Sequence, residues 1–557
     1  MTIRQPLLPS NAKNGNTSHM HLHQHHQHRN HSNYSMTFRL AIIITCFGIV
    51  TVCIAQYKSV AKHPEIMTSS AGVSSIISKD DYISESVVEF RREIPPRRDD
   101  DDESNIEDRL EKDSMHSIEG APQKKNGNND DDGDEKADEA EPGLEYNGTP
   151  LHVVFSTSCS DQMHWESFVF FYHAYKVKQP GTVTRIASGC NDEEAEEARK
   201  FHQASIATMS SRFHLHLTPD FSKQRLHDNA KSSYKYMNKP FGLRDWLEGA
   251  LAMNATKDDP RRVEGVEDGV VILMDPDMVL LRPILHDFSK EDVIYAEEHP
   301  ATTIVTHGKP MAQQDGYLDN KWMHINGSFI TGDPNIGRPK DRSGPLNWNT
   351  GPPYLATVKD MYDISLLWTD YAPRVDHVNP GLFAEMQGYI WATYKLGLPH
   401  TLIKSIVVSN TETPHREGWS YVDALPNDQV CDPPPTANLP IGLHYCGRYA
   451  VGPDFFFSKY RLKKNFLSCE KNLMMPPPRD IGTQYDFFIA PPPASGKPPK
   501  EPEKKTFSKK RVKREAFMMC GLIDSVNEAA TYYKKHNCGD MANYNKVYTI
   551  KNDPGRY

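Results

Sequence analysis

The stretch that decides the fold is Gly269-Val-Val-Ile-Leu-Met-Asp-Pro-Asp277, in which a wholly apolar run ends in two aspartates. An apolar run without alternating polar residues is typical of a strand in a parallel sheet that is covered on both faces. Such sheets bind their ligands just beyond the carboxyl ends of the strands. Asp275 and Asp277 are therefore expected at the edge of the sheet where a ligand would bind.

The two aspartates form a candidate metal site. Carboxylate oxygens are preferred ligands of Mg²⁺ and Mn²⁺, which in turn bind the phosphates of a nucleotide. Asp275 and Asp277 leave the strand one residue apart, on the same side, so both side chains are able to face one cation. The alternative is a polar turn in which the aspartates cap a following helix. We favour the metal site because the pair directly follows a buried strand.

The sequence before the aspartates alternates between strand and helix patterns. Residues 152–155 and 182–187 are rich in β-formers, and residues 164–178 carry apolar side chains at helical spacing. A second helix opens at Asn238-Lys-Pro240, and its apolar stripe consists of Leu243, Trp246, Leu247, Ala250 and Leu251. This alternation predicts an α/β fold with a mostly parallel sheet, in a domain that spans residues 150–480.

Four further side chains are candidates for the same site. His444 would complete a metal shell as a neutral imidazole, or it is a core histidine beside a tight turn. Glu385 opens a helical stretch among apolar neighbours and would contact the acceptor or the reacting sugar; a solvated glutamate at a helix start is the alternative. Arg185 or Lys239 would neutralise a diphosphate, and a structural role is equally compatible with the sequence at both positions.

The N-terminal part of the chain predicts a membrane anchor. Residues 1–39 form a His-rich tail with basic and no acidic residues, and residues 40–57 form an uncharged apolar run. The positive flank precedes the run, which places the tail in the cytosol and the rest of the chain in the lumen. A cleaved signal peptide is the alternative, but the preceding region is long and no small-residue cleavage pattern follows the run.

Two further segments are predicted to lie outside the folded domain. Residues 58–149 are strongly acidic and bury too little apolar surface to fold, so they are expected to form an extended, disordered stem. Residues 481–514 are rich in Pro and Lys and are expected to form a linker to a C-terminal helical segment over residues 515–557. The sequence thus predicts one lumenal domain held away from a membrane.

The cysteines agree with an oxidising, lumenal compartment. Because the number that follows the anchor is odd, at least one stays outside an intramolecular disulfide; they lie at positions 159, 190, 431, 446, 469, 520 and 538. Cys159 with Cys190 is one conceivable pair, and Cys520 and Cys538 would staple the final helix, but the sequence leaves the connectivity open. Asn-x-Ser/Thr glycosylation motifs begin at Asn147, Asn254 and Asn326.

Composition excludes several classes of protein. The 557 residues carry a formal net charge of −9, whereas binding to nucleic acid requires a basic surface. A single long apolar run argues against a multi-pass membrane protein. The chain also lacks a G-x-x-x-x-G-K-[ST] loop and a G-x-S-x-G elbow, which argues against a different enzyme that binds metal through the aspartates, such as a lumenal nucleotidase or phosphotransferase.

Several further motifs follow one another in a defined order. They are Gly181-Thr-Val-Thr-Arg185, Tyr236-Met-Asn-Lys-Pro-Phe241, Trp246-Leu247, Val271-Ile-Leu-Met-Asp-Pro-Asp-Met278, Gly332-Asp-Pro-Asn-Ile-Gly337, Gly351-Pro-Pro-Tyr-Leu355, Leu367-Trp368, Phe383-Ala-Glu-Met-Gln-Gly-Tyr389 and Leu443-His-Tyr445. Their order and spacing resemble the plant hydroxyproline O-arabinosyltransferases and the peptidyl serine α-galactosyltransferases. The resemblance covers roughly residues 150–480.

The resemblance implies a Rossmann-like, GT-A type glycosyltransferase domain that uses a UDP-sugar together with Mn²⁺ or Mg²⁺. Carried over to this sequence, it implies that Glu385 is a catalytic residue facing the reaction centre. The implied metal ligands are Asp275, Asp277 and His444, and the implied donor-binding residues are Arg185, Asn238, Lys239 and Asp275.

The resemblance also predicts an activity and a location. We expect transfer of a sugar, with arabinofuranose favoured, to hydroxyproline of secretory glycoproteins by a single-pass enzyme of the Golgi membrane, or alternatively of the endoplasmic reticulum. The alternatives are a peptidyl serine α-galactosyltransferase and a catalytically silent lumenal binding protein. An inverting enzyme would use Glu385 as the base, whereas a retaining one would use the donor phosphate as base or a carboxylate as nucleophile. The resemblance favours retention.

Overall fold

The computed structural model describes residues 142–226, 233–256, 259–318, 320–337, 343–413, 415–451, 455–483 and 508–547. The predicted tail, anchor and most of the stem lie outside these residues. Within the described part of the chain, no helix combines the length and the apolar character needed to cross a membrane. Strands β1 (Glu145–Tyr146) and β2 (Thr149–Ser158) begin inside the range that the sequence assigns to the stem.

The fold is built on a mixed sheet of eight strands, and its first half is parallel as predicted. The strand order is β4-β3-β2-β5-β8-β7-β9, with β1 paired to β2. The parallel half consists of β4 (Phe213–Thr218), β3 (Thr182–Ser188), β2 and β5 (Val270–Met274). Next to it, β8 (Thr350–Thr357) runs antiparallel to both β5 and β7 (Met311–Gln314), and β9 (Thr401–Ile403) is parallel to β7.

Strand β5 lies in the middle of this sheet and is buried on both faces, which confirms the prediction from its apolar sequence. Ile272 is paired with Val153 of β2 on one side and with Leu355 of β8 on the other. Because successive side chains of a strand point to opposite faces, β5 contributes to two hydrophobic cores. Ile272 belongs to one core and Leu273 to the other.

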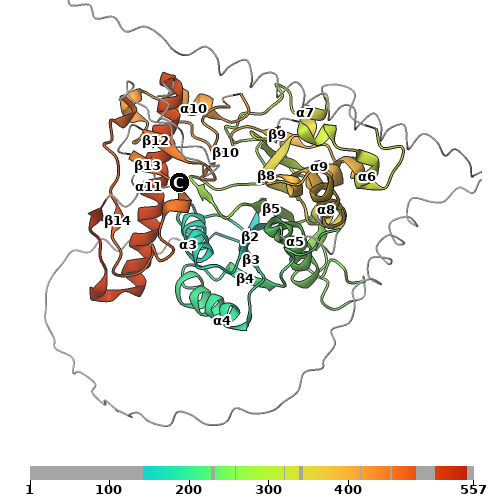
Figure 1. The fold of residues 1–557 in the computed structure, drawn as a ribbon, viewed down its shortest axis with the longest axis horizontal. Helices are drawn as coiled ribbons and strands as arrows, with labels where there is room; N and C mark the ends of the chain where they lie inside the picture. Colours follow the sequence, from blue (N-terminus) through green and yellow to red (C-terminus); the bar gives the residue numbers. More distant parts are fainter. Residues whose placement is uncertain are drawn as a thin grey trace, which may run out of the picture. The chain divides into compact units, whose positions relative to one another are not determined.

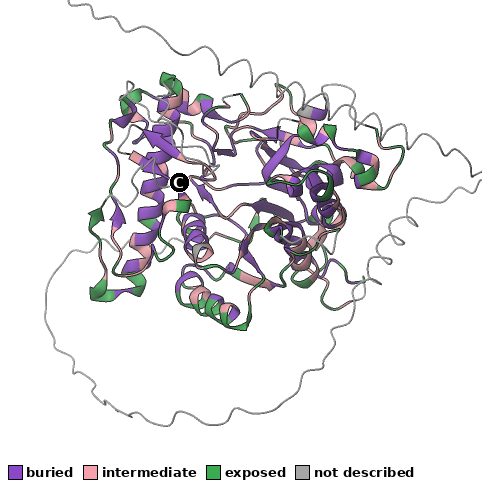
Figure 2. Cartoon of the chain, in the orientation of Figure 1, coloured by how far each residue is buried: buried purple, intermediate pink, exposed green. Residues whose placement is uncertain are grey.

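Helices cover both faces of the sheet (Figure 1). One core packs α3 (Asp161–Lys176) and α11 (Lys509–Asn537) against the sheet. The other core packs α5 (Asn238–Gly249), α8 (Val358–Val378) and α9 (Ala384–Leu396) against the opposite face. Figure 2 shows buried residues running through the central strands and along the inner sides of these helices.

A small second sheet lies directly after β5 and positions the candidate site. It consists of β10 (Val407–Val408), β11 (Gly442–His444) and β6 (Met278–Leu280). Strand β6 is antiparallel to β11, and His444 is paired with Met278. The chain therefore leaves β5 through Asp275-Pro276-Asp277 and enters β6 beside the strand that carries the histidine.

The C-terminal helix is part of the domain and not a separate segment. Helix α11 begins at Lys509, inside the range predicted as a linker, and its buried side belongs to the same core as β2 and β5. Disulfides Cys431–Cys520 and Cys469–Cys538 tie it to the preceding chain. A third disulfide joins Cys159 to Cys190, and Cys446 is the free cysteine of the described residues.

The remaining elements are short, apart from α4. They are α4 (Asp192–Phe201), α6 (Gly327–Thr331), α7 (Ser343–Asn347), α10 (Trp419–Ala424), the strand pairs β12 (Tyr449–Val451) with β13 (Phe455–Phe457) and β14 (Leu473–Met474) with β15 (Lys546–Val547), and single turns at His202–Ile206, Lys235–Met237, Val266–Asp268, Lys321–His324, Asn427–Gln429, Lys459–Arg461, Ile481–Thr483 and Gly539–Met541. The predicted stripe of α5 holds only in part, because the helix ends at Gly249 and Ala250 is exposed beyond it.

Candidate functional site

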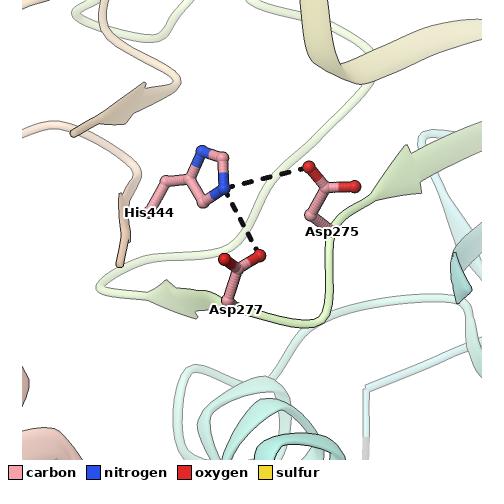
Figure 3. Close-up of side chains that lie close together, drawn as sticks. All are labelled: Asp275, Asp277 and His444. Atoms are coloured by element: carbon pink, nitrogen blue, oxygen red, sulfur yellow. Dashed lines mark ion pairs between the residues drawn. The ribbon is translucent and has the colours of Figure 1, made fainter. Parts of the chain in front are cut away.

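The site forms where β5 ends. Asp275 and Asp277 occupy the turn between β5 and β6, and His444 is the last residue of β11. The imidazole Nε2 of His444 lies 3.3 Å from Oδ1 of Asp277 and 3.8 Å from Oδ2 of Asp275 (Figure 3). The backbone N–H of Tyr445 donates to the carbonyl of Asp277 over 2.9 Å, which fixes the turn against the strand.

These three side chains fit a divalent cation. Each offers one ligand atom, and the three atoms all lie within 4.8 Å of one another. Two carboxylate oxygens and one imidazole nitrogen suit Mn²⁺, and also Mg²⁺ with added water. Burial lowers the pKa of His444, but Cys446 and Asp277 raise it more, so its pKa lies well above the usual value. A cation therefore competes with a proton for Nε2.

The second oxygen of each aspartate is bonded to a lysine. Nζ of Lys239, in the first turn of α5, lies 2.8 Å from Oδ1 of Asp275. Nζ of Lys459, which follows β13, lies 2.7 Å from Oδ2 of Asp277. Each carboxylate thus turns one oxygen toward His444 and the other toward an ammonium group. Two cationic side chains beside a candidate metal site are suited to binding a diphosphate.

The charges around Asp277 keep it ionised. Burial alone raises the pKa of its carboxyl group, but Lys459 and His444 lower it further than burial raises it. The same balance holds for Lys459: burial lowers its pKa, and Asp277 and Glu166 outweigh that effect. The site therefore presents charged groups in a buried setting, where their interactions are stronger than in water.

Glu385 lies beside Lys239, whose ammonium group also contacts Asp275. It is in the first turn of α9, with a side chain only 2% exposed, and its Oε1 accepts from Nζ of Lys239 over 2.9 Å. Its Oε2 is buried without a hydrogen-bond partner among the described residues. Burial raises the pKa of Glu385, although the charge of Lys239 opposes the rise. The interpretation as a solvated glutamate is therefore wrong.

The backbone of the site is held by buried tyrosine and tryptophan side chains. The N–H of Glu385 donates to the hydroxyl of Tyr234 over 3.2 Å, and its carbonyl accepts from Nε1 of Trp368 over 2.7 Å. The hydroxyl of Tyr449 donates to the carbonyl of His444 over 3.0 Å. These bonds fix the backbone at Glu385 and His444 and so orient the side chains of these two residues before any ligand binds.

Two predicted donor-binding residues make other contacts. Arg185 is 1% exposed; its Nε donates to Oγ1 of Thr157 over 2.9 Å and its Nη2 to the carbonyl of Ser158 over 3.2 Å. Burial lowers the pKa of Arg185 to about 10. The side-chain oxygen of Asn238 accepts from the backbone N–H of Phe221 over 2.8 Å. Among the described residues, no hydrogen bond or ion pair joins either side chain to the aspartates, His444, Lys239 or Glu385.

The sequence interpretation missed Lys459 and Glu166. Lys459 follows the run Phe455-Phe-Phe457, and no spacing in the sequence connects it with the aspartates. Glu166 lies on α3 beside the apolar stripe and would be expected in solvent, but it is fully buried, with Oε2 3.7 Å from Nζ of Lys459. Its position next to the apolar stripe of the predicted helix was the available signal, and its burial depends on contacts between distant segments.

Comparison with curated proteins finds two relatives. The chain is 22% identical over 338 residues to a peptidyl serine alpha-galactosyltransferase of Arabidopsis thaliana, and the match covers 59% of this chain and 34% of that protein. It is 29% identical over 143 residues to a peptidyl serine alpha-galactosyltransferase of Chlamydomonas reinhardtii, which covers 26% of this chain and 16% of that protein. The chain thus spans about a third or less of the length of these relatives. No protein-family model matches the chain.

Comparison with solved structures finds several partial likenesses. An active-site mutant of LgtC matches 53% of this chain and 87% of its own, at a TM-score of 0.29 and 11% identity. The bifunctional glycosyltransferase WbbM matches 54% of this chain and 46% of its own, at a TM-score of 0.28 and 10% identity. TM-scores this low do not assign a fold. The two relatives found by sequence confirm the resemblance seen in the motifs: the chain is related to the peptidyl serine α-galactosyltransferases.

Proposed function

We propose that this protein is a metal-dependent glycosyltransferase of GT-A type, which transfers a sugar from a UDP-sugar to a hydroxyl group of a secretory polypeptide. The observation that carries the proposal is the convergence of Asp275, Asp277 and His444 at the carboxyl end of β5, with a lysine on each aspartate. The two relatives support it, since both are named as glycosyltransferases that act on peptides.

Different residues of the site would bind the metal and the phosphates of the donor. Asp275, Asp277 and His444 would hold Mn²⁺ or Mg²⁺, which supplies positive charge against the charge that grows on the leaving diphosphate. Lys239 and Lys459 contact the aspartate oxygens that do not face His444, and they would bind the phosphates directly. Because all five side chains are held by other residues before substrate binds, the site stabilises the leaving group with little rearrangement.

Glu385 is the candidate residue for contact with the sugar of the donor, where the reaction takes place. Its Oε1 is bonded to Lys239, and its buried Oε2 is able to accept a hydrogen bond from a substrate hydroxyl. In an inverting reaction this oxygen would take the proton of the acceptor, and a raised pKa suits a base that works near neutral pH. In a retaining reaction Glu385 would orient the sugar while the donor phosphate takes the proton. The anomeric configuration of the product, read by NMR, distinguishes the two.

The choice of donor sugar and acceptor residue depends on parts of the protein other than the two aspartates. The names of the two relatives support transfer of galactose to serine. Transfer of arabinofuranose to hydroxyproline is the activity that the motif resemblance favoured, and it uses the same diphosphate site. Incubation of the full chain with Mn²⁺, UDP-galactose or UDP-arabinofuranose, and peptides that contain either serine or hydroxyproline tests both. Mass spectrometry of the peptides reports the added sugar and its position.

We also propose a single-pass enzyme of the Golgi membrane, anchored by residues 40–57. The support is the uncharged apolar run behind a basic tail, together with disulfides, which form in the secretory pathway. Imaging of the tagged full chain beside Golgi and endoplasmic reticulum markers tests the location. Retention in the endoplasmic reticulum would favour the alternative.

A further inference from the structure

The carboxylate of Glu166 is buried in the core of the domain, close to the candidate metal site. It lies on α3 with a fully buried side chain, next to Trp165, whose ring stacks on Tyr445 with centroids 6.5 Å apart. Burying a carboxylate costs free energy unless a cation or hydrogen-bond donors compensate. The ammonium group of Lys459 lies 3.7 Å from Oε2 and is one cation that compensates the charge.

Lys459 therefore lies between two carboxylates. Its Nζ is 2.7 Å from Asp277 and 3.7 Å from Glu166, and its side chain is only 12% exposed. Asp277 is a candidate metal ligand, whereas Glu166 lies on α3 and is not one of the three candidate ligands. The two carboxylates compete for one ammonium group, and any charge that leaves Glu166 strengthens the hold of Lys459 on Asp277.

We propose that Glu166 is a positioning residue for the transferase site, which shares the ammonium group of Lys459 with Asp277. Its negative charge keeps the ammonium group shared, so that Asp277 stays available to a divalent cation and Lys459 to the donor diphosphate. The inference rests on the proposed function, because it takes Asp277 as a metal ligand. It gives a role to a carboxylate that is fully buried beside the site.

A purely structural role for Glu166 leads to a different expected result. If Glu166 only filled space and compensated the charge of Lys459, its neutral isostere would lower stability and leave the metal affinity of the folded protein unchanged. If it positions Lys459, E166Q should weaken Mn²⁺ binding, because Lys459 then bonds Asp277 alone. Removal of Lys459 in the same protein should restore the affinity. A purely structural role predicts no loss in E166Q for the second substitution to reverse.

The test is a Mn²⁺ titration of the full chain without nucleotide, with free Mn²⁺ read by electron paramagnetic resonance. We expect E166Q to weaken binding about tenfold, the lower end for residues that orient metal ligands. The Mn²⁺ affinity of E166Q/K459M should return to within about twofold of the wild type. E166D keeps the charge, so its affinity should lie between those of E166Q and the wild type. Glu515→Gln is the matched control, since Glu515 is a buried glutamate on α11 that accepts from Thr411 and Ala450.

The outcomes separate this inference from the proposed function. A wild type that does not bind Mn²⁺ would overturn the metal site itself. A wild type that binds, with E166Q of equal affinity, would overturn the role of Glu166 alone. So would a weakened E166Q whose affinity K459M does not restore. E166D and E166Q/K459M decide the question even where E166Q folds poorly, because E166D keeps the buried ion pair and the double variant removes both of its charges together.

Discussion

Lys459 donates to Asp277 over 2.7 Å across a sequence separation of 182 residues. The contact joins the turn after β5 to the turn after β13, and these two strands belong to different sheets. It gives the candidate site a cation that its sequence motifs do not contain. The charge of Lys459 lies beside Asp277, one of the groups that would bind the metal.

Loss of the Lys459 charge should weaken donor binding more than acceptor binding. K459M removes the ammonium group and keeps most of the apolar stem, so the KM for the UDP-sugar should rise about tenfold while the KM for the peptide changes little. K459R keeps the charge and should recover part of the loss. Steady-state kinetics with each substrate varied in turn measures this. Equal effects on both KM values would contradict a role in binding the diphosphate.

The stability of the domain should fall as the medium is acidified from pH 6.5 toward pH 4. His173 is fully buried, where its Nε2 donates to the carbonyl of Ser525, and burial lowers its pKa to about 4. The unfolded chain, with a histidine pKa near 6.5, binds the proton first, so the stabilising contribution is complete above pH 6.5 and is lost as the pH falls toward 4. The loss is about 2 kcal/mol between pH 7 and pH 5.

Chemical unfolding of the wild type and of H173Q at the two pH values isolates this contribution. The wild type should lose more stability than H173Q on acidification, because glutamine does not titrate. His536 is exposed, so H536Q is the control: it removes a histidine from the surface and should leave the pH dependence of stability unchanged. Identical pH dependence in wild type and H173Q would show that His173 does not carry the effect.

The disulfide Cys431–Cys520 should stabilise the domain through α11. It closes a sequence separation of 89 residues and ties the middle of α11 to the chain before β11. C431S/C520S should lower the free energy of unfolding by about 2 to 4 kcal/mol, by the loss of loop-closure entropy. Thermal unfolding with and without reductant measures the change. Cys446→Ser, which breaks no disulfide, should leave the reductant-sensitive part of the stability intact.

Asn254 and Asn326 should carry N-linked glycans if the domain is lumenal. Both begin glycosylation motifs, and both are exposed in the structure. Digestion of the protein from secretory-pathway membranes with an N-glycosidase should increase its mobility on a gel, and N254Q/N326Q should abolish most of the shift. A protein that the enzyme does not shift would contradict the predicted topology.

The sequence was sufficient to place β5 and the two aspartates. Apolar side chains along the whole of Val270–Met274 require apolar neighbours on both faces, and only a central strand supplies them. The aspartates then follow at the ligand-binding edge. The sequence also offered His444 and Lys239 as candidates for the same site, and the structure brings both to the aspartates.

The rest depended on contacts between distant segments. Strands β6 and β11 are three residues each, too short for a pattern to be recognised, and their pairing determines where His444 lies. Glu166 is polar and lies beside the apolar stripe of α3, so local rules place it in solvent. The position of α11 in the core was missed for a related reason: its helical pattern does not say which surface it covers.

The most direct test of the central claim is release of UDP by the full chain from a panel of UDP-sugars, with Mn²⁺ and with peptides that contain serine or hydroxyproline. D277N removes one candidate ligand, and the exposed Asp192→Asn on α4 is the matched control. The account predicts release from one UDP-sugar that is stimulated by peptide, abolished by a chelator, reduced at least about a hundredfold in D277N and unchanged in D192N. Release that is equal in D277N and the wild type, or no release from any UDP-sugar, would contradict it.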